Sequence, residues 1–138
     1  MKIGCSPAYI FAHFGERATF KDVIWSAKRI AQLGFCCLQL ETYNLKQKDI
    51  YKGNRVNKIR HLFQDLGLEI SQFNVHAIRR DLVSLNKKRR NTALEEFKKL
   101  VGIAAELELV DVVTIPSSPI PEMIVEYHET YPGGIQPI

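Results

Sequence analysis

The sequence predicts an α/β fold built from parallel (β/α) units, with about four strands. The first observation is a unit that recurs along the chain: the end of a helix, a turn, an apolar strand and a polar residue at the strand's far end. Its copies are residues 31–41, 64–76 and 105–115. The second observation is that the turns between helix and strand are short. Together they favour parallel strands joined by right-handed helical crossovers.

The expected elements follow from apolar spacing and from residues that begin or end helices. Strands are expected at residues 2–6, 35–41, 68–76 and 109–115, and helices between 19 and 34, at 54–66 and at 87–107. Thr19 and Asp22 have the spacing of a capping box, and Asn86 is a candidate cap for the third helix. Gly34 and Gly67 are expected to end the first two helices.

The segments between these elements differ in character. The loop at residues 8–17 carries Tyr9, Phe11, His13 and Phe14, so we expect it to fold over the end of the sheet or over a ligand. A polar connection is expected at 43–53. Residues 116–138 hold five of the six prolines and are expected to form a loop or tail, with one short helix near 122–127 as an option.

Size and composition indicate a single α/β domain over residues 1–138 with a core of its own. The chain is 46% hydrophobic and 25% charged, which is typical of a soluble globular protein, and no apolar run approaches the roughly 18 residues that span a membrane. Residues 1–5 lack the apolar segment of a secretion signal. The three cysteines include the adjacent Cys36 and Cys37, which are poorly placed to pair with each other. We therefore expect a cytoplasmic protein with reduced thiols.

Polar residues gather on one face of the second and third strands. Alternation places Leu38 and Leu40 on an aliphatic face. The opposite face is expected to carry Gln39, Glu41, Ile70, Gln72, Asn74 and His76. A doubly wound sheet would read as continuous apolar runs, so a polar face fits the interior of a barrel better. In (β/α)8 barrels catalytic groups lie at the C-terminal ends of the strands, where Glu41 and His76 fall.

These positions predict a substrate-binding site, although no residue is assigned a catalytic role. His76 could bind a metal, act as a general acid or base, or donate to a sugar hydroxyl; the alternative is a structural histidine bonded to a neighbour. Glu41 could instead pair with a loop cation. Gln39 and Asn74 would orient the substrate through hydrogen bonds, and Tyr9 would contact it from the loop. The sequence contains no zinc-type Cys/His spacing, phosphate-binding glycine loop or nucleophile elbow.

The net charge of +4 comes with two basic clusters, Arg79–Arg80 and residues 87–90. Such runs are usually solvated helix starts. Binding of phosphate or nucleic acid is the alternative. Because no aromatic residues are interleaved with the cations, nucleic acid is not the expected partner.

Over residues 1–118 the chain resembles the xylose-isomerase-like TIM barrels of sugar isomerases and epimerases, which are related to endonuclease IV. The resemblance is carried by the order and spacing of residues 1–6, 31–35, 38–40, 67–70, 75–76 and 104–107. It implies an enzyme that uses a divalent metal (Mn, Mg, Co or Zn) to move a proton or hydride within a small sugar or polyol.

The resemblance also indicates roles for single residues. His76 matches a histidine at the end of the third strand that contacts substrate or, in endonuclease IV, zinc. Gln39 replaces a frequent glutamate, and Glu108 replaces the glycine that usually closes the third helix. Residues 115–118 lack the histidine of endonuclease IV relatives, which argues against three-zinc DNA repair.

Length limits these expectations, because a (β/α)8 barrel has about 250 residues. The resemblance is therefore to the N-terminal half of a barrel, without the later strands that carry the family's metal ligands. We expect a fragment of a longer protein, two half-barrels that associate as a homo-oligomer or with a completing partner, or a rearranged flavodoxin-like sheet. The corresponding functions are an isomerase or epimerase that is inactive as this chain alone, a non-enzymatic assembling half-barrel, or, third, endonuclease IV-like DNA repair.

Overall fold

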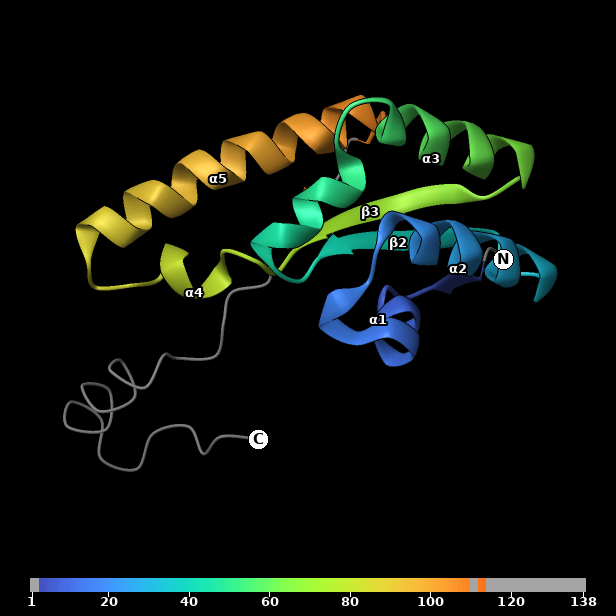
Figure 1. Ribbon diagram of the computed structural model, residues 1–138, viewed down its shortest axis with the longest axis horizontal. Helices are drawn as coiled ribbons and strands as arrows, with labels where there is room; N and C mark the ends of the chain where they lie inside the picture. Colours follow the sequence, from blue (N-terminus) through green and yellow to red (C-terminus); the bar gives the residue numbers. More distant parts are fainter. Residues whose placement is uncertain (1–2, 110–111, 114–138) are drawn as a thin grey trace.

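The computed structural model describes residues 3–109 and 112–113, which form a parallel sheet of four strands in the order β1-β2-β3-β4 (Figure 1). The strands are β1 (Gly4–Cys5), β2 (Cys37–Thr42), β3 (Glu69–Val75) and β4 (Val112–Val113). This confirms the expected α/β fold with parallel strands. A flavodoxin-like sheet has the order 2-1-3, so the sequential order found here contradicts that alternative.

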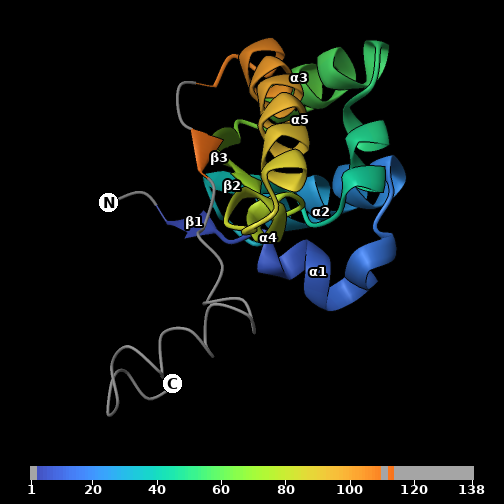
Figure 2. The same ribbon diagram turned by 90° about the vertical axis from the view of Figure 1, so that its left-hand side faces the viewer.

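Three long helices connect the strands: α2 (Phe20–Gln32), α3 (Asn54–Asp65) and α5 (Lys87–Glu106). Figure 2 shows all three on the same side of the sheet. Parallel strands in sequential order produce this arrangement when every crossover is right-handed.

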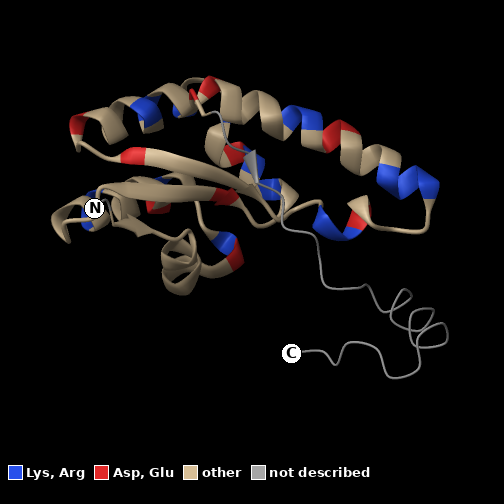
Figure 3. Cartoon of the chain, turned by 180° about the vertical axis from the view of Figure 1, so that it is seen from behind, with Lys and Arg blue, Asp and Glu red and all other residues tan. Residues whose placement is uncertain are grey.

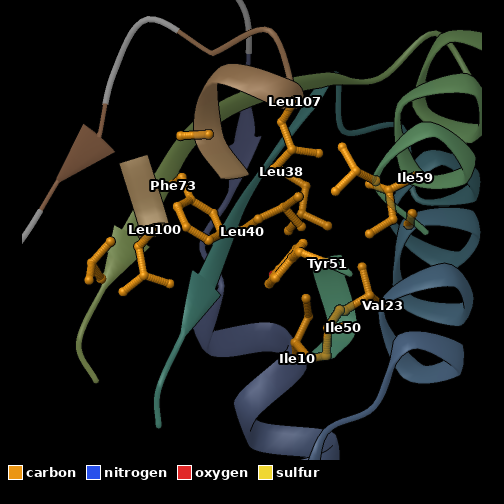
Figure 4. Packing of buried hydrophobic residues seen from close by; sticks show 14 of the residues in the cluster. Ile10, Val23, Leu38, Leu40, Ile50, Tyr51, Ile59, Phe73, Leu100 and Leu107 are labelled. Atoms are coloured by element: carbon orange, nitrogen blue, oxygen red, sulfur yellow. The ribbon is translucent and has the colours of Figure 1, made fainter. Parts of the chain in front are cut away.

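The hydrophobic core lies between these helices and one face of the sheet. Leu38 and Leu40 on β2 and Phe73 on β3 are fully buried, and they meet Ile59 of α3 and Leu100 of α5 (Figure 4). The aliphatic face predicted for β2 is therefore the face that packs against the helices.

The helix ends follow the residues that predicted them. The Thr19 backbone N–H donates to the Asp22 carboxylate at 2.7 Å, and Asn86 Oδ1 accepts from the Lys88 N–H at 2.9 Å. Gly67 ends α3 with φ +65°. Glu108 takes the equivalent position after α5 with φ +61°, a left-handed conformation that costs a non-glycine residue about 1 kcal/mol.

The connections at the two ends of the strands differ in length. Each segment from a strand to the next long helix contains helical turns: α1 (Ala8–Phe14) with η1 (Gly15–Arg17), then η2 (Leu45–Tyr51), then α4 (Arg79–Leu82). The expectation of a loop at residues 8–17 was therefore wrong, and the connection expected at 43–53 contains the helical turns of η2. All of these segments follow the C-terminal ends of strands. They therefore gather at the end of the sheet where Glu41 and His76 lie.

One further expectation was wrong: Ile70 faces the helices and not the polar face. The reason is a bulge in β3, since Leu38 pairs with Ile70 but Leu40 pairs with Phe73. In α5, Gly102 has no atom within 4 Å of the position a Cβ would take.

Part of the expected structure falls outside the described residues. This part comprises the tail at 116–138, the optional helix at 122–127 and most of the fourth strand. Within the described part of the chain, no helix is long and apolar enough to cross a membrane.

Candidate functional site

Glu41 and His76 meet at the C-terminal edge of β2 and β3. Glu41 is the last residue but one of β2, and His76 directly follows β3. The backbone N–H of His76 donates to the Thr42 carbonyl at 3.0 Å, which fixes where the histidine leaves the sheet. His76 Nε2 lies 3.4 Å from Glu41 Oε2, and the two side chains are 14% and 11% exposed.

The surroundings of this pair favour the neutral form of each group. Burial lowers the pKa of His76, and the positive charge of Arg79 lowers it further. Burial also raises the pKa of Glu41. Among the described residues, His76 Nδ1 is buried and has no hydrogen-bond partner. These surroundings favour the neutral imidazole at pH 7, and its Nε2 lies beside the carboxylate without forming a hydrogen bond to it.

Tyr51 fixes the backbone at Glu41. Its hydroxyl donates to the Glu41 carbonyl at 2.9 Å, and its ring packs edge-on against Phe73 at 5.1 Å between centroids. Tyr51 is 2% exposed, and burial raises the pKa of its hydroxyl well above the ordinary value, so it remains a donor at all working pH values. η2, which carries Tyr51, thus holds the end of β2 in place.

Tyr43 was missed among the candidate residues. Its ring lies 6.2 Å from the His76 ring between centroids, and on its other side it contacts Phe11 of α1 at 4.6 Å. The backbone N–H of Tyr43 donates to Gln47 Oε1 at 2.6 Å. An aromatic residue two positions after a strand-end carboxylate was the available signal, because such a residue must lie at the same edge.

The remaining predicted residues separate into two groups. Asn74 is 7% exposed and is the ladder partner of Glu41, so it belongs with the pair. The side-chain amide of Gln39 instead donates to Gln72 Oε1 at 2.7 Å. Gln39 lies two residues before Glu41 on β2, further from the C-terminal end of the strand. Tyr9 lies on α1, where its ring contacts His13 at 4.6 Å rather than the pair.

A cleft of about 350 Å³ opens beside His76, at the low end of the range for small-molecule sites. Tyr43 and Ala77 line it together with His76. Its charged lining residues are Glu16, Arg79, Arg80, Asp81 and Arg89. A larger groove of about 730 Å³ lies between η1, η2 and the starts of α2 and α3, but neither Glu41 nor His76 lines it.

The described residues provide only part of a metal site. A carboxylate and an imidazole are donor types that Mn²⁺ and Zn²⁺ accept in proteins. Glu41 and His76 supply two such groups, and within residues 3–109 and 112–113 no three His, Cys, Asp or Glu side chains gather in a way that could hold an ion. A metal centre would need ligands from outside this set.

A scan against protein-family models gives no match to this chain, and a search of curated proteins finds no significant match.

Proposed function

We propose that this protein binds a small sugar or polyol at the C-terminal edge of β2 and β3, as one side of an isomerase- or epimerase-like site. The observation that carries the proposal is the pair formed by Glu41 and His76, 3.4 Å apart and largely buried. Buried groups of this kind are costly without polar partners. Sugar hydroxyls would supply those partners, since they both donate and accept hydrogen bonds.

The pair is suited to moving protons between adjacent carbons of such a substrate. A carboxylate whose pKa is raised by burial is a stronger base than an exposed one, and so Glu41 can accept a proton from a carbon next to a carbonyl. The neutral imidazole of His76 can donate to the substrate oxygen through Nε2–H, because Nδ1 is buried. A divalent metal, when bound with additional ligands, would stabilise the negative charge on that oxygen.

We also propose that the sheet is half of a (β/α)8 barrel, with the polar face inside. Sequential strand order, long helices on one face and longer connections after the strands all support this. Among the described strands β1 and β4 each pair on one side only, so closure needs further strands. Those strands could belong to the same polypeptide, a second copy or a partner, and turnover would require them.

A second candidate is a non-enzymatic half-barrel that assembles with itself or with a partner. It is favoured by β1 and β4, each of which pairs with only one other described strand. Light scattering on the purified chain distinguishes it: assembly predicts at least twice the mass of one chain. A monodisperse monomer over the working concentration range would contradict self-assembly. Cytoplasmic location belongs to the same set of proposals, because the three cysteines are free thiols.

The binding proposal is tested by NMR titration with neutral aldoses, ketoses and polyols. We expect saturable shifts of the His76 ring and Tyr43 signals with millimolar affinity, and weaker binding in Glu41→Gln. His61→Gln is the matched control, because His61 is an exposed histidine on α3. Shifts that are absent throughout the panel, or that are the same in Glu41→Gln, would contradict the proposal.

A further inference from the structure

The cations between residues 79 and 90 do not all have the same surroundings. Arg90 Nη1 donates to the carbonyls of Ser84 and Leu85 at 2.7 and 2.8 Å, so it holds the connection before α5. Arg89 pairs with Asp81 at 3.3 Å. Arg79 and Arg80, in contrast, form no ion pair or side-chain hydrogen bond with any other described residue. Among the described residues, these two adjacent guanidinium groups therefore have no anionic partner.

The backbone conformation after β3 places these two arginines beside the candidate site. The backbone N–H of Arg79 donates to the His76 carbonyl at 3.2 Å, and both arginines line the same cleft as His76 and Tyr43. Figure 3 shows the basic residues of α4 and of the first turn of α5 at the same end of the molecule. The positive charge of Arg79 also acts on the pKa of His76, which supports their proximity.

We propose that the cleft beside His76 takes the phosphate group of a phosphorylated sugar, with Arg79 and Arg80 as its ligands. This rests on the proposed function and deepens it by naming the substrate class. Guanidinium groups bind phosphate through paired, charge-assisted hydrogen bonds. The phosphate binds at Arg79 and Arg80, and the hydroxyl or carbonyl end of the sugar reaches His76, which lines the same cleft. The charges of the site therefore orient the substrate.

The lining favours a single phosphate over a nucleic acid. The cleft is only about 350 Å³ in volume, and it contains the carboxylates of Glu16 and Asp81. A polyanionic backbone that followed the basic surface would meet both carboxylates, whereas one phosphate can be bound by Arg79 and Arg80 alone. Surface binding of nucleic acid would also use Lys87 and Lys88, which do not line the cleft.

Calorimetric titration of the full chain with three probes tests this inference: a pentose, the same pentose carrying a 5-phosphate, and inorganic phosphate. We expect the phosphate ester to bind about ten- to a hundredfold more tightly than the pentose, the range that charge-assisted hydrogen bonds provide. In the double variant Arg79→Gln/Arg80→Gln the phosphate ester should bind no more tightly than the pentose. Lys87→Gln/Lys88→Gln removes the same charge outside the cleft and should keep the preference.

The outcomes separate this inference from the proposed function. If the pentose binds in a Glu41-dependent way and the phosphate ester binds no more tightly, the phosphate site is refuted and the sugar site stands. If only inorganic phosphate binds, and depends on Arg79 and Arg80, the anion site stands and the sugar proposal fails. A short single-stranded DNA that binds more tightly than the ester, with equal losses in both double variants, would refute the phosphate site in favour of a nucleic-acid surface.

Discussion

Replacing Tyr51 by phenylalanine removes one hydroxyl beneath the Glu41–His76 pair and should lower the free energy of unfolding by about 1–2 kcal/mol. The hydroxyl donates to the Glu41 carbonyl at 2.9 Å, and the side chain is 2% exposed. The ring remains, so its edge-on packing against Phe73 is retained. The loss therefore has two parts: the hydrogen bond itself, and a buried carbonyl that loses this donor.

Urea unfolding followed by circular dichroism measures this loss. With a typical urea dependence of about 2 kcal/mol/M, the midpoint should fall by about 0.5–1 M while the slope stays unchanged. Tyr43→Phe is the matched control, because no described residue bonds to the Tyr43 hydroxyl, and its effect should stay within about 0.5 kcal/mol.

Two results would refute this reasoning about Tyr51. A loss equal to that of Tyr43→Phe would mean that the hydroxyl does not stabilise the end of β2. A changed slope would mean that the substitution acts on the compactness of one of the states rather than on one hydrogen bond.

Other predictions concern titration and backbone conformation. Because folding raises the pKa of Glu41 above its ordinary value of 4.5, the wild-type free energy of unfolding should fall as pH rises from 4.5 through the folded pKa. In urea titrations at different pH values, Glu41→Gln should remove this fall. An unchanged pH profile in the variant would refute the prediction. Because the pKa of His76 is lowered on folding, stability should also fall as pH drops below 6.5, and NMR of the ring should show titration below that value; a ring that titrates at or above it would contradict the assignment. Gly67→Ala places a side chain at φ +65° and should destabilise by about 1 kcal/mol. Gly102→Ala, within α5, should stabilise by about 1 kcal/mol. The two alanine variants should therefore shift the melting temperature in opposite directions, and shifts of the same sign would contradict the backbone explanation.

The helices and the parallel strands could be predicted because their signals are local. Thr19 and Asn86 are capping residues, and Gly67 ends a helix, whatever else the chain does. Strand polarity follows from the short helix-to-strand turns. Such signals depend on a few neighbouring residues and not on contacts across the fold.

The short helices and the bulge could not be predicted in this way. α1 and η2 form where Ile10, Ile50 and Tyr51 are buried against the core. Their partners are distant in sequence, and each segment is too short to show a periodic apolar pattern of its own. The bulge in β3 shifts the alternation by one residue, so Ile70 changes face while Phe73 does not.

The candidate site could likewise be predicted only in part. Glu41 and His76 were found because each lies at the end of a strand, and parallel strands bring such ends together. Tyr43 and Arg79 come from connections whose path the sequence does not specify. Tyr9 lies on α1 with its ring against His13, and its contact with a substrate stays a prediction.

The stability of the fold itself gives no reason to keep Glu41 and His76. Both are largely buried, and burial moves the pKa of each toward its neutral form, so charging either group opposes folding. Apolar residues of similar size would often serve stability as well or better. Groups that are unfavourable for folding are typical of functional sites, where activity and stability are in conflict. A ligand that gives hydrogen bonds to the Glu41 carboxylate would offset part of this unfavourable burial on binding, which is why the pair, rather than the larger groove, is the site to test first.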